Sequence, residues 1–217
     1  MSGPVRPGWP AALRRAALRP AALRPRLAVL ALALLGAGGT ARTEGPAPPD
    51  AYTLDAGSRF QIDGTSTLGR YSCAASAVTG SADVPVAGPM EAEVTVGVRS
   101  FDCGQARMNR DFRRALQAEG HPEIRFDLDT AAALAAEARP GAWVPVRATG
   151  RLRLAGVERA VTVTAEGQRL GRGHVRLRGQ HAMRMTDFRV EPPSGMLGMV
   201  RARDPVVVRF DLTASAH

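Results

Sequence analysis

Histidine, cysteine and carboxylate side chains are the groups in this sequence that could act as bases, nucleophiles or metal ligands. The four histidines are His121, His174, His181 and His217. His121 sits in a turn before Pro122, and His217 is the last residue. His174 and His181 have opposite parity, so a continuous strand would point them to opposite faces. No HExxH, GxSxG, P-loop or paired-cysteine motif is present. The sequence therefore predicts no catalytic site and no metal site.

The two cysteines and one pair of acidic residues leave alternatives open. Cys73 and Cys103 have no cysteine or histidine neighbour at metal-ligand spacing. A single disulfide is the favoured interpretation in an exported chain, and two separate buried thiols remain an alternative because spacing does not establish a short Cα separation. Asp187 and Glu191 could form a carboxylate pair, although a solvated loop explains them better.

The basic charge is concentrated in the first 41 residues. The chain of 217 residues has a net charge of +9, and residues 1–41 contain six arginines and no acid, which leaves +3 for the remainder. An Arg-rich stretch to Arg26, an apolar run from Leu27 to Ala37 and small residues before Ala41 are typical of a secretory signal peptide. The interpretation is a signal peptide over residues 1–41, with a retained anchor as the alternative. Arginines interleaved with acids in the remainder argue against a nucleic-acid partner.

The rest of the chain is expected to form one exported domain. Residues 42–51 are Pro-rich and read as a flexible leader, and residues 52–214 can bury one core. The apolar run of the expected signal peptide is shorter than the roughly 20 residues of a spanning helix. No integral membrane span is therefore expected after cleavage. The expected location is periplasmic or secreted.

One amphipathic helix is expected between Met108 and Gly120. Its apolar face would cover an end of the fold. Asn109 is the expected N-cap, Asp111 lies in the expected first turn, and Gly120 is suited to the left-handed position that ends a helix. Pro122 cannot continue the helix.

Strands with alternating apolar and polar residues make up most of the domain. An Ala-rich stretch, Thr130–Ala138, is expected to add a turn or two of helix. About eight such strands predict an all-β, antiparallel, roughly eight-stranded barrel with the short helix capping one end, because closure removes the exposed sheet edges. A two-sheet sandwich is the alternative. The expected strands cover residues 58–63, 71–79, 91–101, 124–129, 143–154, 160–170, 174–185 and 205–214.

Three segments in order resemble the YceI-like, polyisoprenoid-binding proteins. They are MNRDFRRALQAEGHPEIRF, GRLRLAGVERAVTVTAEG and MRMTDFRVEPPSGMLGMVRARDPVVVRFDL, and the similarity runs from about Tyr52 to Ala214. In the most similar branch Ser-Thr-Leu precedes a His-Asp-aromatic run and a Cys; here Ser66-Thr67-Leu68 is followed by GRYSC, so the His-Asp pair is absent. The resemblance implies an exported lipocalin-like barrel whose elongated apolar cavity holds the tail of an isoprenoid lipid or quinone, without covalent chemistry.

The alternation itself places apolar side chains, and no titratable side chain, on the inward faces of the strands. Periodicity cannot distinguish a hollow interior from a filled one. The loop from Thr186 to Asp204 is expected to cross a barrel mouth or to pack as a plug. Phe188 and Trp143 either line the cavity or complete the core, and the core is favoured. The candidate ligand-binding residues are Val94, Val96, Val98, Phe112, Leu116, Ile124, Phe126, Val146, Leu152, Val161, Val163, Val175, Leu177, Phe188, Met196, Leu197, Met199, Val206, Val208 and Phe210.

The expected function is a non-catalytic binding module that sequesters or carries an isoprenoid lipid or quinone, with no other cofactor. An exported enzyme that acts on a lipid-like substrate in the same pocket is one alternative. A structural barrel with a solid core is another. The sequence leaves open whether the protein forms a homodimer.

Overall fold

The computed structural model describes residues 50–85, 88–133, 141–171, 173–195 and 199–217. The expected signal peptide and residues 42–49 of the expected leader lie outside this part. The last two leader residues belong to strand β1 (Asp50–Leu54), because Asp50 pairs with Val84 and Ala51 pairs with Asp83 of the neighbouring strand.

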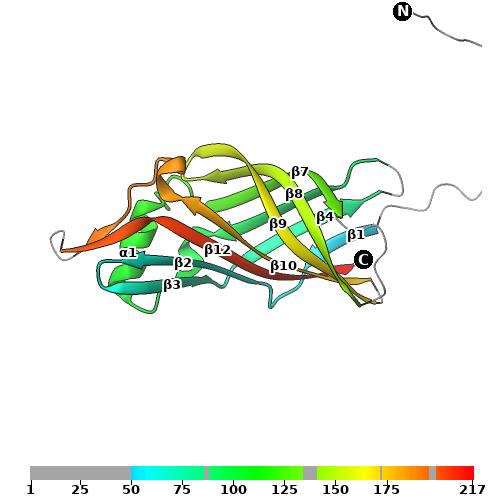
Figure 1. Ribbon diagram of the computed structural model, residues 1–217, viewed down its shortest axis with the longest axis horizontal. Coiled ribbons are helices and arrows are strands. Elements are labelled where there is room, and N and C mark those ends of the chain that lie inside the picture. Colours follow the sequence, from blue (N-terminus) through cyan, green and yellow to red (C-terminus); the bar gives the residue numbers. More distant parts are fainter. Residues whose placement is uncertain (1–49, 86–87, 134–140, 172, 196–198) are drawn as a thin grey trace, which may run out of the picture. The chain divides into compact units, whose positions relative to one another are not determined.

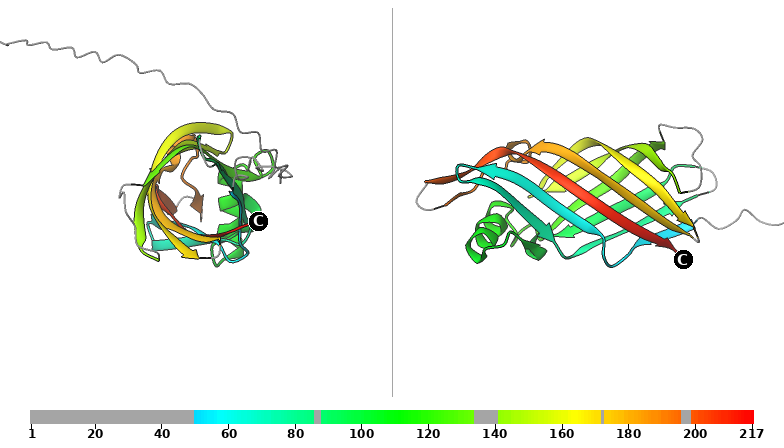
Figure 2. Two further views of the ribbon diagram at one scale, coloured as in Figure 1. Left: turned by 90° about the vertical axis from the view of Figure 1, so that its right-hand side faces the viewer. Right: turned by 60° about the horizontal axis from the view of Figure 1, so that its bottom comes forward.

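Eight of the described strands close into an antiparallel barrel, as predicted (Figure 1). Their order is β1-β4-β5-β7-β8-β9-β10-β12, and β12 pairs with β1 to complete the ring. Figure 2 shows this ring from one end. Because the sheet closes on itself, its strands have no free edge along the ring. The bounds of the other seven strands are β4 (Val78–Val84), β5 (Glu91–Gly97), β7 (Glu123–Ala133), β8 (Trp143–Leu154), β9 (Val157–Gly171), β10 (His174–Arg184) and β12 (Val200–Ala216).

The long strand β12 pairs with two different strands on the same side. Near its C-terminus it pairs with β1, and its middle pairs with β2 (Arg59–Ser66), which continues into β3 (Gly69–Ala75) and β6 (Phe101–Asp102). A short hairpin joins β12 to β11 (Ser194–Gly195). The strands β2 and β3 therefore extend the wall toward the end of the barrel where helix α1 (Ala106–Ala115) lies, here called the helix end (Figure 2).

Alternation sets the inward face of the wall, as β8 and β9 show. Ala148 of β8 pairs with Val163 of β9, and the flanking Thr149 pairs with Thr162, whose hydroxyl lies 3.2 Å from that of Thr149 on the exposed face. The two strands are joined by Ala155 and Gly156, both at positive φ. Two successive left-handed residues make the tight turn whose twist matches paired antiparallel strands.

Two strand predictions and one helix prediction differ from the structure. The expected strand 71–79 is split, because residues 76–77 separate β3 from β4. The expected strand 91–101 ends at Gly97, and a 3-10 turn η1 (Val98–Ser100) follows, in which Ser100 Oγ donates to the Gly97 carbonyl (2.7 Å). The residues Thr130–Ala133 are strand and not helix, since they pair with β8. Residues 134–138 of that expected helix lie outside the described part.

Helix α1 is present, but its caps differ from those predicted. It begins one turn earlier than expected, after Gln105, so Asn109 lies within the helix and Asp111 lies beyond its first turn. The left-handed residue at its C-terminal end is Gln117 (φ 53°) instead of Gly120. The Ala118 N–H donates to the carbonyl of Arg113, and the helix ends at Ala115, five residues before Gly120.

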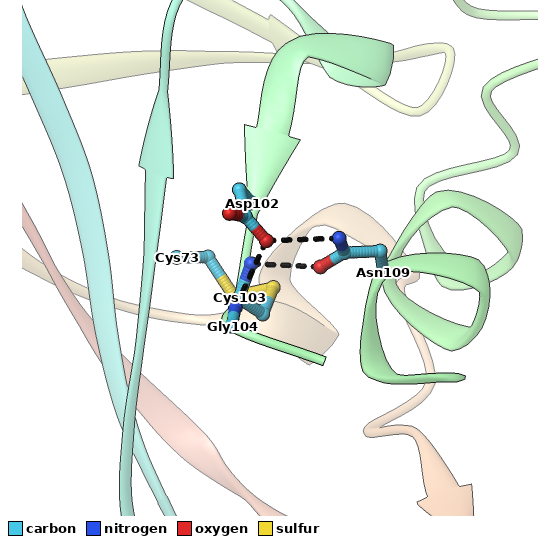
Figure 3. Close-up of a disulfide and its surroundings, with 5 residues drawn as sticks. All are labelled: Cys73, Asp102, Cys103, Gly104 and Asn109. Atoms are coloured by element: carbon cyan, nitrogen blue, oxygen red, sulfur yellow. Dashed lines mark hydrogen bonds between the residues drawn. A yellow bond between two sulfur atoms is a disulfide. The ribbon is translucent and has the colours of Figure 1, made fainter. Parts of the chain in front are cut away.

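The predicted disulfide is present and fixes the start of the helix. Cys73 of β3 is bonded to Cys103, which lies between β6 and α1 (Figure 3). The Asn109 amide oxygen accepts the Cys103 backbone N–H (2.7 Å), and its amide nitrogen donates to Asp102 Oδ1 (2.9 Å) (Figure 3). Asn109 thus ties the first turn of α1 to the disulfide, which is a different role from the predicted N-cap.

The densest packing lies at the helix end. Phe101 is 1% exposed, and its ring packs against Phe60 (6.1 Å between centroids) and against Phe112 of α1 (4.9 Å). Phe188 of the 3-10 turn η2 (Met185–Phe188) and Val190 after it complete this cluster. The buried core is therefore concentrated where helix, turns and strand ends meet.

Candidate functional site

The barrel encloses a cavity of about 1550 Å³. This volume exceeds the roughly 300–1,000 Å³ of pockets that hold drug-sized ligands. Strand residues of alternate parity line it, as in Val144, Val146 and Ala148 of β8 and Val206, Val208 and Phe210 of β12. The architecture is therefore a hollow barrel with a largely apolar wall, and the sandwich and solid-core alternatives do not apply.

Glycines opposite aromatic residues hold the cavity open. Phe210 pairs with Gly179, and a Cβ at Gly179 would lie 2.6 Å from Phe210 Cζ, so the ring lies across the glycine. The Phe126 ring lies in the same way over Gly150, where a Cβ would be 2.6 Å from Cζ. A large ring that lies flat on a neighbouring strand takes little volume from the interior. These pairs explain how a barrel containing several aromatic residues stays hollow.

The structure places most of the candidate ligand-binding residues on the cavity wall. Strand parity brings those of β5, β7, β8, β9, β10 and β12 together, and α1 adds two from the helix end. Whether they contact a ligand stays a prediction. The candidates on the wall are Val94, Phe112, Leu116, Ile124, Phe126, Val146, Leu152, Val161, Val163, Val175, Leu177, Val206, Val208 and Phe210.

Three candidates lie in the core instead of on the cavity wall. Val96 (2% exposed), Val98 (1%) and Phe188 (2%) are enclosed by the cluster at the helix end. Val98 left the predicted alternation because its N–H donates to the Pro122 carbonyl (2.8 Å), which draws it into the η1 turn. For Phe188 the favoured core interpretation is confirmed.

The loop candidates do not line the cavity in the described part of the chain. Met199, just before β12, is 69% exposed and is not among the residues that line the cavity. Met196 and Leu197 lie outside the described residues. Asp187 belongs to η2, where it accepts the Arg184 backbone N–H (3.4 Å), and Glu191 is exposed.

Polar side chains also line the cavity, and sequence reasoning missed His181 and Tyr71 among them. His181 continues the inward series Val175, Leu177 and Gly179, and it lines the cavity, so the expectation of no titratable group on the inward faces is wrong. Burial lowers the pKa of His181 and raises the pKa of Tyr71, which also lines the cavity. If the alternation of β10 had been extended two residues beyond Gly179, it would have placed His181 on the inward face.

The outward face carries arginines paired with carboxylates of neighbouring strands. Arg176 donates to Asp211 across β10 and β12 (Nε to Oδ1, 2.7 Å), and this hydrogen bond lowers the pKa of Asp211. Arg178 donates to Glu166 (2.9 Å) and lies 3.8 Å from the centroid of the Trp143 ring. Trp143 is thus on the outward face, neither in the core nor on the cavity wall. Pairs this exposed contribute little to stability.

The described residues do not contain a group of three or more histidine, cysteine or acidic side chains placed to hold a metal ion. Within the same ranges, no helix has both the length and the apolar character needed to cross a bilayer.

Solved structures share this fold. BcnA of Burkholderia cenocepacia is 20% identical (TM-score 0.61; 74% of this chain and 98% of that chain covered). A polyisoprenoid binding domain from Saccharophagus degradans, implicated in plant cell wall breakdown, is 18% identical (TM-score 0.63; 77% and 99% covered). A mutant YceI protein of Campylobacter jejuni is 13% identical (TM-score 0.51; 67% and 84% covered). At these identities the likeness shows the fold.

Among curated proteins no match is found. The model of the YceI-like domain matches residues 52–214, which is most of the chain and nearly the whole of the barrel that encloses the cavity. Barrel, helix and sequence agree, and the chain belongs to the YceI-like family.

Proposed function

We propose that this protein is an exported, non-catalytic binding protein that sequesters or carries an isoprenoid lipid or quinone in its barrel cavity. The observation that carries the proposal is the cavity of about 1550 Å³ with its largely apolar wall. The Saccharophagus degradans relative, described as a polyisoprenoid binding domain, supports the same class of ligand.

The wall favours a long aliphatic tail for a physical reason. Each Å² of apolar surface removed from water contributes about 25 cal/mol, so a tail gains affinity with every unit that enters. Valine, leucine and alanine side chains offer no directed hydrogen bond. They therefore favour a ligand tail that is long and flexible, and they set few requirements on its detailed shape. Branched prenyl chains meet both requirements.

The chemistry of the wall supports binding over catalysis. A catalytic base or nucleophile is held in place by a hydrogen-bonded partner. Among the described residues, His181 has neither a hydrogen-bond partner nor an ion-pair partner, and the two cysteines are joined to each other. An isolated imidazole on a largely apolar wall lacks the orienting group that an enzyme of this kind needs.

The proposed export is supported by the N-terminal segment and by the disulfide. Residues 1–41 have the pattern of a signal peptide, and the Cys73–Cys103 bond is of a kind that persists in oxidising compartments. The full chain expressed in a bacterium should yield a mature protein in the periplasmic or extracellular fraction. N-terminal sequencing should show cleavage near Ala41. Uncleaved protein retained with the membrane would contradict export.

Mass spectrometry of the natively exported protein tests the ligand. Organic extracts should contain a prenyl lipid or quinone, chemically unchanged. Val163→Trp, which adds an indole to the cavity wall, should reduce the recovered lipid several-fold. Thr164→Trp is the matched control, because Thr164 is the neighbouring residue on the exposed face of the same strand and should leave the yield unchanged. Protein that carries no lipid and binds neither quinones nor polyprenols would reject the proposal.

A further inference from the structure

Two polar side chains on the cavity wall lack partners within the described protein. Among the described residues, neither the Tyr71 hydroxyl nor the His181 imidazole makes a hydrogen bond with another group. Both are partly buried and line the cavity, and burial shifts both pKa values toward the uncharged form. Polar groups in apolar surroundings are normally hydrogen-bonded, because leaving them without a partner costs free energy. An occupant of the cavity can supply the missing partners.

Strand register brings these two residues to the same part of the wall. Tyr71 pairs with Gly64, Gly64 with Val206, and Val206 with Met183. His181 is two residues from Met183 and faces the same side. The Tyr71 ring lies over Gly64, where an added Cβ would collide with it, so its hydroxyl end points from β3 toward β12 and β10. Gly64 and Met183 are two strand spacings apart, about 10 Å. His181 lies two residues, about 7 Å, farther along β10, so the two side chains border a shared area of wall that is large enough for a ring.

The floor between them is smooth and apolar. Val208, the partner of His181, and Ile62, the partner of Val208, lie there and line the cavity. Phe210 borders the same area, with its ring held flat over Gly179. A planar group can rest on such a floor while its edge reaches the hydroxyl on one side and the imidazole on the other.

We propose that Tyr71 and His181 form a head-group subsite inside the cavity that takes an uncharged ring bearing carbonyl or hydroxyl oxygens, as in a quinone or its quinol. The inference rests on the proposed function and specifies its ligand: the head group lies within the barrel, not at its mouth. Tyr71 donates its O–H to one oxygen, and the His181 ring donates or accepts at the other. Burial lowers the pKa of His181 and so favours the uncharged imidazole, which is a weak partner for a phosphate head group.

Three probes with the same tail test this subsite by calorimetry. They are a geranyl-substituted benzoquinone, a hydrocarbon with the geranyl skeleton, and geranyl phosphate. The wild-type protein should bind the quinone most tightly. Tyr71→Phe and His181→Leu should each weaken quinone binding by about threefold to tenfold, the range for one hydrogen bond. Both should leave hydrocarbon binding unchanged or slightly stronger.

His174→Leu is the matched control, since it removes a histidine of opposite parity from the same strand and should not change the binding of any probe. Thermal unfolding identifies any variant that fails to fold. For a position-specific readout, the His181 ring signal, assigned by its loss in His181→Leu, should shift on addition of the quinone and stay in place with the hydrocarbon.

The outcomes separate the subsite from the function. If both variants bind the quinone as the wild type does, or if geranyl phosphate binds best, the subsite is wrong while the lipid-binding function stands. If the wild type binds none of the three probes, the proposed function fails and the subsite fails with it.

Discussion

The helix end and the middle of the barrel are built from the same residue types with opposite results. At the helix end, Phe101, Val96 and Val98 are almost completely buried against one another. In the middle, Phe126, Val146 and Val163 lie on the wall of a large cavity. The difference comes from what faces each set: α1, η1 and η2 fill the helix end, whereas the middle is faced only by the opposite wall. Stability and binding capacity are therefore expected to respond to different substitutions.

The largest expected effect is on core packing. Phe101→Ala should lower the free energy of unfolding by about 3–5 kcal/mol, because it leaves a closed void between Phe60 and Phe112. Phe126→Ala removes the same atoms from a ring that already faces the cavity, and should cost at most about 2 kcal/mol. Urea unfolding of the two variants measures the contrast, and equal losses would show that the middle is as tightly packed as the helix end.

Loss of the disulfide should rank next. The bond joins residues 30 positions apart, and removing such a constraint typically costs about 2–4 kcal/mol. Cys73→Ser combined with Cys103→Ser should therefore shift the urea midpoint strongly downward. Wild-type protein unfolded with a reductant should match the double variant. A double variant as stable as the oxidised wild type would mean that the hydrogen bonds of Asn109 suffice to hold α1.

A smaller effect should come from crowding the cavity. Gly179→Ala places a Cβ against the Phe210 ring and should push that ring inward, lowering lipid binding several-fold and stability by about 1 kcal/mol or more. Gly167→Ala is the control, because its Cβ would meet Val146 and Leu177 at 3.5 and 3.8 Å, ordinary contact distances. Lipid loading measured by mass spectrometry should fall in the first variant only.

The smallest effect concerns pH. Burial lowers the pKa of His181, so below about pH 6.5 the unfolded chain takes up its proton more readily than the folded chain. Stability should therefore be complete above this pH and decline as the pH falls through the lowered pKa. His181→Leu should flatten that part of the profile, measured by urea unfolding from about pH 5 to 8.

The carboxylates act in a separate range of pH. Hydrogen bonds from Arg176 to Asp211 and from Thr186 to Asp204 lower the pKa values of both acids, so their contribution is lost only below the ordinary range near pH 4. If the stability of His181→Leu depends on pH above pH 5 in the same way as that of the wild type, the decline is not caused by His181.

The sequence predicted the bounds of an element well where the local pattern of residues determines them. The strand expected at 143–154 matches β8 in both bounds, because strict alternation and the turn at Ala155–Gly156 are encoded within it. The caps of α1 were misplaced, since Asn109 is engaged by Cys103 and Asp102. Those contacts depend on the disulfide and on β6, which no local pattern describes.

The candidate site shows the same division. Alternation predicted the parity of Val146, Val163 and Val208 correctly, and these side chains do face inward. The same rule misplaced Val96 and Val98 on the cavity wall, because their surroundings come from distant turns. The placement of Tyr71 with His181 depends on register across β2 and β12, and only the folded sheet fixes that register.

The sequence by itself determined the antiparallel strands, the short helix and the apolar inward faces, because each depends on periodicity or composition. It favoured a disulfide between Cys73 and Cys103, and the structure shows that bond. Only the tertiary structure decided that these faces surround an open space, which end is filled, and which polar groups reach the interior. The physical reason is that the alternation of apolar and polar residues shows only which side of a strand avoids water. The volume of the cavity depends on which side chains of the opposite wall face that side.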